Sequence, residues 1–110
     1  MIIHSPDPER VREFLAEVLG FSSVDAGGGW PIFALPPAEL AVHPTGGVAG
    51  RHQLYLMCDD LQETVQELER KGVQLRRPIR EERWGVVTAI QLPDGAELAL
   101  YEPRHPIPPS

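Results

Sequence analysis

The chain has 110 residues, a formal net charge of −6 at pH 7 and one cysteine, Cys58. This length supports one hydrophobic core and one domain. The acidic balance, without a basic stripe, excludes a nucleic-acid surface, and no apolar run approaches the ~20 residues of a membrane span. One cysteine excludes an internal disulfide and a cysteine-rich zinc site. The first residues lack the cationic start and apolar run of a signal peptide, so we expect a cytoplasmic protein.

Two segments, residues 8–19 and 61–71, have the apolar periodicity of amphipathic helices. Each follows an aspartate, a favoured N-cap residue, and ends near a glycine, which suits the left-handed turn after a helix. These flanking residues are Asp7, Asp60, Gly20 and Gly72.

The other periodic segments are short and bounded by Gly or Pro, which predicts strands. They cover residues 30–35, 38–43, 53–58, 73–77, 84–92 and 96–101, and further short strands are expected at 2–5 and 21–25.

An internal repeat links these elements. The sequence AELAV at 38–42 matches AELAL at 96–100; each copy follows Leu-Pro and lies downstream of a tryptophan. The two predicted helices precede these copies in the same order, so the chain is predicted to form β-α-β-β-β twice. This order predicts one domain over residues 1–103. The predicted domain consists of module one (1–45), a loop (46–51) and module two (52–103), and a Pro-rich tail (104–110) follows it.

Two sequence motifs, FLAEVLGF at 14–21 and LPDGAEL at 92–98, together with the paired modules, resemble the vicinal oxygen chelate superfamily. This superfamily includes glyoxalase I, bleomycin-resistance proteins and extradiol dioxygenases. The resemblance extends from residue 2 to 103. It implies an α+β fold in which two βαβββ modules form a curved mixed sheet with a concave cleft, and it implies a homodimer.

Enzymes of this superfamily hold a metal with His and Glu on the first and last strand of each module. Carried over by the family's motifs, these positions fall at Gln53, Ala99, Ala41 and a site before Met1. None of the three residues present is His or Glu, so we expect no metal site of the family type.

Strand alternation predicts which side chains face the cleft, because residues two apart share one face of a strand. Apolar residues at 40, 42, 54, 56, 58, 98 and 100 are assigned to the core, and Cys58 is therefore expected to be a small core residue. The predicted cleft residues are Glu39, His43, Gln53, Tyr55, Met57, Glu97 and Tyr101, with Trp84 at the rim. This polar and aromatic set suits a small-molecule ligand.

Three functions remain open. The favoured one is a small-molecule binder of the bleomycin-resistance type without cofactor or metal. The second is a lyase, isomerase or extradiol-type dioxygenase with one divalent metal on relocated ligands. The third is an interaction module with a filled cleft. The relocated ligands would be Glu39, Glu97, His43 or His52, and the alternative for these residues is a solvated surface position. The two tyrosines either orient a ligand or pack at a dimer interface. The arginines of residues 76–83 either attract an anionic substrate or are exposed strand residues; they are Arg76, Arg77, Arg80 and Arg83.

Overall fold

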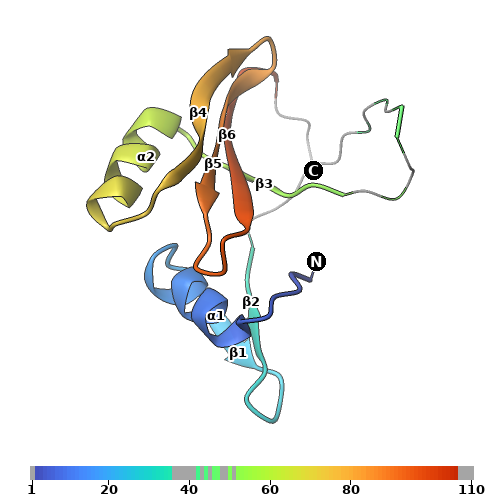
Figure 1. Ribbon diagram of the computed structural model, residues 1–110, viewed down its shortest axis with the longest axis vertical. Coiled ribbons are helices and arrows are strands. Elements are labelled where there is room, and N and C mark those ends of the chain that lie inside the picture. Colours follow the sequence, from blue (N-terminus) through green and yellow to red (C-terminus); the bar gives the residue numbers. More distant parts are fainter. Residues whose placement is uncertain are drawn as a thin grey trace.

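The computed structural model describes residues 2–35, 42, 44, 46–47, 50 and 52–106. These residues form an α+β structure in which two helices accompany a two-stranded sheet and a four-stranded mixed sheet (Figure 1). No helix in this part of the chain is long and apolar enough to cross a membrane.

The second module forms the four-stranded sheet and confirms the predicted β-α-β-β-β order. The strands lie in the order β3-β6-β5-β4, with β3 parallel to β6 and the other neighbours antiparallel. The elements are β3 (Tyr55–Met57), α2 (Leu61–Arg70), β4 (Leu75–Glu82), β5 (Gly85–Gln91) and β6 (Glu97–Pro103).

Helix α2 begins and ends as its sequence predicts. The Asp60 carboxylate accepts a hydrogen bond from the Glu63 backbone N–H at 3.0 Å, which satisfies one of the free donors of the first turn. After the helix, Gly72 adopts a left-handed φ of +86°. This turn lets the Val73 N–H donate to the Leu68 carbonyl at 3.0 Å and closes the last turn.

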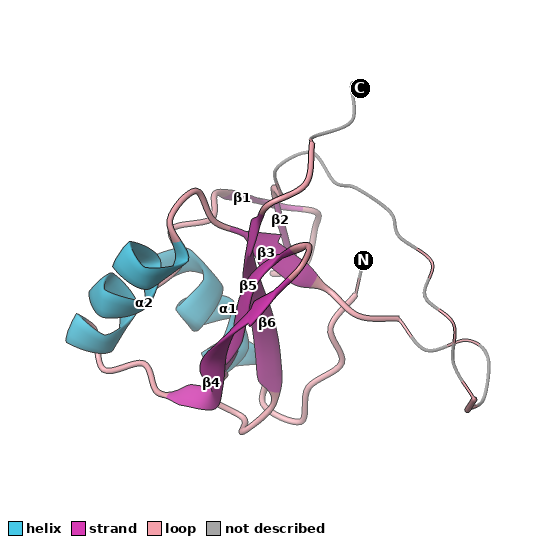
Figure 2. Cartoon of the chain, turned by 90° about the horizontal axis from the view of Figure 1, so that it is seen from above, coloured by secondary structure: helices cyan, strands magenta, loops and turns pink. Residues whose placement is uncertain are grey.

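The core lies between α2 and one face of this sheet. Leu61 and Ile90 are fully buried, and Leu98 and Leu100 of β6 are 5% and 2% exposed. Phe14 belongs to the same cluster, and both helices lie on one side of the sheet (Figure 2). The alternation predicted for β6 is therefore confirmed, and the odd-numbered residues of that strand face away from the helices.

The first module is described in part. It contains α1 (Pro8–Glu17) and an antiparallel pair, β1 (Ser23–Asp25) and β2 (Pro31–Phe33). Asp7 precedes α1, but its side chain makes no capping hydrogen bond. Residues 38–41 and 43 of the expected strand at 38–43 lie outside the described residues. The assignment of Val42 to a strand and to the core is wrong, because this residue forms no strand and is 89% exposed.

The expected strand at 2–5 is wrong, because these residues form no strand. Ile2 is 78% exposed, and Ser5 instead donates a hydrogen bond to the Asp94 carboxylate at 2.6 Å. A strand needs a neighbour to pair its backbone groups, and this short segment is anchored through one side chain.

Candidate functional site

Three aromatic side chains meet on the face of the four-stranded sheet that points away from the helices. The ring centroids of Tyr55 and Tyr101 are 5.6 Å apart, and Trp84 lies 6.3 Å from Tyr55 and 5.7 Å from Tyr101. The rings meet edge to face, at 69° to 85°, a favoured geometry for aromatic pairs. All three side chains are half-buried, so they present ring edges and faces to a ligand. We call these three residues the aromatic surface.

The three rings reach this face from two kinds of position, two from neighbouring strands and one from a turn. Tyr55 and Tyr101 lie on neighbouring parallel strands, where Tyr55 pairs with Ala99 and Met57 with Tyr101. Tyr55 and Tyr101 are therefore diagonal neighbours on the two strands, and aromatic side chains are long enough to make contact across a diagonal pair. Trp84 lies in the turn between β4 and β5, directly before Gly85. The structure thus brings together three of the residues that strand alternation and the rim position predicted.

His105 extends the aromatic surface, and sequence reasoning missed it. Its ring lies 6.3 Å from Tyr101 at an interplanar angle of 30°, with the Tyr101 hydroxyl 3.4 Å from Nε2. Arg104, the residue before His105, is also held in place, because its backbone N–H donates to the Trp84 backbone carbonyl at 2.9 Å. Nothing in the composition of the Pro-rich tail indicates this path, because it depends on contacts with distant residues.

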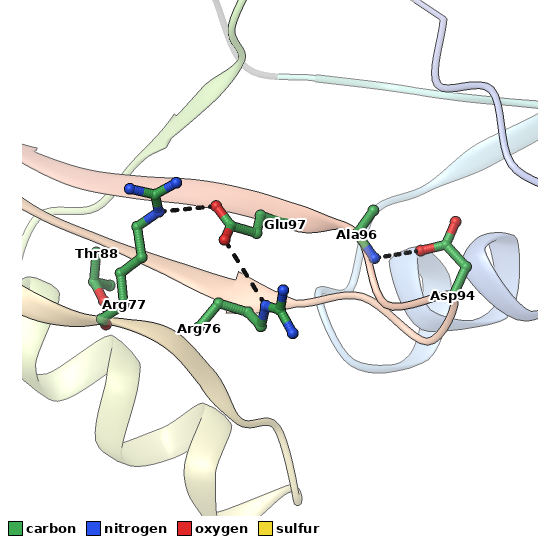
Figure 3. A network of polar contacts seen from close by, with 6 residues as sticks. All are labelled: Arg76, Arg77, Thr88, Asp94, Ala96 and Glu97. Atoms are coloured by element: carbon green, nitrogen blue, oxygen red, sulfur yellow. Dashed lines mark hydrogen bonds and ion pairs between the residues drawn. The ribbon is translucent and has the colours of Figure 1, made fainter.

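An ion-paired cluster lies at the other end of β6 (Figure 3). The Glu97 carboxylate is 2.9 Å from Nε of Arg77 and 3.8 Å from Nε of Arg76. Arg77 pairs in register with Ala89 of β5, so its side chain crosses above a small residue to reach β6. The Thr88 hydroxyl donates to the Arg77 carbonyl at 2.7 Å and holds the irregular β4 backbone at this point.

These contacts change the interpretation of Glu97. Its carboxylate is the shared ion-pair partner of Arg76 and Arg77. From the sequence, these arginines are expected to be exposed strand residues, with attraction of an anionic substrate as the alternative. Their side chains are indeed 45% and 63% exposed, but they reach across the sheet to the predicted cleft residue. Strand alternation alone missed this, because β4 has register shifts between residues 75 and 80.

Of the remaining predicted site residues, Gln53 borders the aromatic surface, and the others lie apart from it or outside the described part of the chain. Gln53 is exposed and accepts a long hydrogen bond of 3.5 Å from the Tyr55 hydroxyl. Met57 is 37% exposed and lines a cavity between the helices. Because β3 is a three-residue edge strand, a long, flexible side chain can reach around it. Glu39 and His43 lie outside the described residues.

Two hollows in the described part of the chain lie away from the aromatic surface. A cavity of about 300 Å³ lies between the segment after α1, β3 and α2, and a hollow of about 380 Å³ lies along β1 and β2. Neither is lined by Tyr55, Trp84 or Tyr101. The half-buried rings of the aromatic surface can hold a planar ligand by stacking.

The divalent metal implied by the resemblance does not fit the candidate ligand residues that the structure describes. Ala99, at one family ligand position, offers only a methyl group beside Tyr55. The Glu97 carboxylate is already ion-paired with two arginines, and His52 is exposed. Among the residues that the structure describes, no three His, Cys, Asp or Glu side chains gather in a way that could hold a metal ion.

The chain is similar to known proteins both in its sequence family and in its fold. The profile of the Glyoxalase/Bleomycin resistance protein/Dioxygenase superfamily matches residues 2–100. No curated protein sequence matches the chain significantly.

Solved structures share the fold at low sequence identity. TnmS3, an antibiotic binding protein from Streptomyces sp. CB03234, is 24% identical, with a TM-score of 0.67 over 92% of this chain and 90% of that chain. A lactoylglutathione lyase from Agrobacterium tumefaciens is 16% identical, with a TM-score of 0.66 over 91% and 88%. A superfamily member from Sphaerobacter thermophilus is 24% identical, with a TM-score of 0.61 over 92% and 91%.

These identities support a common fold and leave the chemistry to the residues of each site. From the profile match over most of its length, the chain belongs to the Glyoxalase/Bleomycin resistance protein/Dioxygenase superfamily.

Proposed function

We propose that this protein binds a small molecule with a planar ring on the aromatic surface, without the metal of the superfamily's enzymes. The observation that carries this proposal is the contact of Tyr55, Trp84 and Tyr101 at 5.6 to 6.3 Å on the helix-free face of the sheet. The similarity in fold to TnmS3, an antibiotic binding protein, supports small-molecule binding as the role of this protein.

The chemistry of the surface favours a flat, largely apolar ligand. Aromatic pairs contribute about 0.5–1.5 kcal/mol beyond the burial of their area. The phenol groups of Tyr55 and Tyr101 add hydrogen-bonding groups at the edge of the rings. Such a combination of rings with few polar groups is typical of small-molecule sites. At the far end of β6, the Arg76, Arg77 and Glu97 cluster carries both charges and can select among charged substituents.

Three probes of equal ring size test this proposal: uncharged 1-naphthol, anionic 1-naphthoate and cationic 1-naphthylmethylammonium. We expect the protein to bind at least one of them, as measured by calorimetry, and Trp84→Ala to weaken that binding at least tenfold. Trp30→Ala is the matched control, because Trp30 is 66% exposed and lies outside the aromatic surface. Equal affinities of the two variants, or no binding of any probe at millimolar concentration, would contradict the proposal.

A second measurement addresses the metal. Dialysis against EDTA should leave the affinity for the bound probe unchanged, and elemental analysis of the protein before dialysis should find no stoichiometric divalent ion. A loss of binding that zinc or manganese restores would instead favour the relocated metal site.

A further inference from the structure

The cavity between the two helices lies on the opposite side of the sheet from the aromatic surface. Its volume is about 300 Å³. The walls are mostly apolar and come from three parts of the chain, with Leu19 just after α1, Leu56 on β3 and Leu68 on α2 among them. The cavity is therefore bounded by elements of both modules and is separate from the site proposed above.

The lining of this cavity includes two uncharged polar side chains. Cys58 and Thr64 line it together with the apolar side chains. Burial raises the pKa of the Cys58 thiol above its ordinary value, against the opposing effect of a hydrogen bond with Thr64. The Thr64 hydroxyl donates its one proton to the Asp60 carbonyl at 2.9 Å, so the two lone pairs of its oxygen can accept from the Cys58 thiol and from a ligand.

Two opposite charges line the cavity, one on α2 and one at the residue that follows it. Glu67 and Lys71 both line it and are one helical turn apart. The Lys71 ammonium donates to the Val18 carbonyl at 3.3 Å, which links α2 to the end of α1. Because the two charges have opposite signs, this rim gives no net attraction to an anion or a cation. A charged ligand would also lose its hydration in the apolar interior without gaining a buried partner.

We propose that this cavity is a second binding site, which takes an uncharged bicyclic or smaller ring compound with a single hydrogen-bonding group. An apolar cavity of about 150 Å³ is large enough for benzene, so the larger cavity here has room for a fused two-ring molecule. The ring packs between Leu19, Leu56 and Leu68, and the Thr64 oxygen accepts the single N–H or O–H.

Fluorine NMR measures the binding of 5-fluoroindole, and the reactivity of the Cys58 thiol reports whether the probe occupies this cavity. We expect 5-fluoroindole to slow the alkylation of the Cys58 thiol by iodoacetamide at least fivefold, because both occupy the same cavity. The charged analogue 5-fluoroindole-2-carboxylate should bind at least tenfold more weakly. Alkylation that proceeds at the same rate with and without saturating 5-fluoroindole, or equal affinity for the charged analogue, would overturn the proposal.

Two variants separate this site from the aromatic surface. Leu19→Phe adds volume to the cavity and should weaken 5-fluoroindole binding at least tenfold, while Trp84→Ala should leave the protection of Cys58 unchanged. Loss of that protection in Trp84→Ala would assign the probe to the aromatic surface and overturn the second site. The alkylation experiment uses the unaltered protein, so it decides the matter even where Leu19→Phe fails to fold.

Discussion

The Glu102 carboxylate accepts a hydrogen bond from the Leu61 backbone N–H at 2.9 Å, and so ties the last strand to the first turn of α2. Leu61 is fully buried, so water cannot easily replace this acceptor. Asp60 already binds the Glu63 N–H, and two carboxylates thus share the free donors of one helix N-terminus, where negative charge is favoured.

Replacing Glu102 by alanine should therefore lower the free energy of unfolding. We expect a loss of about 1–2 kcal/mol, because a buried N–H loses its charged acceptor. Urea denaturation followed by circular dichroism measures it. Glu69→Ala removes an exposed carboxylate from the other end of the same helix and should change the stability by less than about 0.5 kcal/mol. Equal effects of the two changes would mean that Glu102 does not cap α2.

Asp94 gives the protein a stability contribution that depends on pH. The Ser5 hydroxyl and then the Ala96 N–H donate to its carboxylate and lower its pKa below the ordinary value. A carboxyl group with a lower pKa in the folded state stabilises that state above its unfolded pKa of about 3.9. This contribution is lost as the pH falls through the folded pKa.

The melting temperature of Asp94→Asn should therefore lie below that of the unaltered protein at pH 7, and the difference should shrink below about pH 3.9. Ser5→Ala should reproduce part of the loss at pH 7. Asp59→Asn serves as the control, because Asp59 is exposed. A difference that stays constant from pH 7 to pH 2 would exclude the ionised carboxylate as its source.

Gly85 allows the close approach of β5 and β6 beside the aromatic surface. A Cβ atom at this position would meet the Glu102 carbonyl oxygen and the Tyr101 ring. Gly85→Ala should therefore destabilise the fold by about 1–3 kcal/mol, as overpacking does. It should also weaken 1-naphthol binding, because the Tyr101 ring must move. Gly46→Ala is the matched control, since nothing lies within 4 Å of the added atom; a similar loss there would point to a general effect of removing glycine.

The ion-paired cluster should set the charge preference of the ligand. Glu97→Gln removes the shared carboxylate and leaves the guanidinium groups of Arg76 and Arg77 without this partner. We expect the affinity for 1-naphthoate to rise about three- to tenfold relative to 1-naphthol, with a smaller gain at high salt. Glu63→Gln changes the net charge equally on α2 and should leave the ratio unchanged. The same ratio in both variants would place the ligand away from β6.

Part of this fold could be predicted from the sequence because the relevant preferences are local. The apolar stripe of α2, its Asp60 cap and Gly72 after its end are read over a few residues. The alternation in β6 predicted which residues would be buried, and Leu98 and Leu100 are. The strand expected at 2–5 failed because a strand also needs a partner, which its own residues do not specify.

The candidate site divides in the same way. Alternation and the rim position predicted Tyr55, Tyr101 and Trp84, and the sequence by itself also determined that Ala99 offers no metal ligand. Only the tertiary structure decided that His105 stacks on Tyr101. The tertiary structure likewise decided that Arg77 forms an ion pair with Glu97.

The internal repeat by itself determined the order in which the elements of this protein follow one another. The tertiary structure alone decided which side chains neutralise one another and where α1 and α2 leave a cavity. The physical reason is that helix and strand periodicity depends on neighbours a few residues away. A contact such as that between Lys71 and Val18 joins distant segments, and it forms only where the packing of the whole chain brings them together.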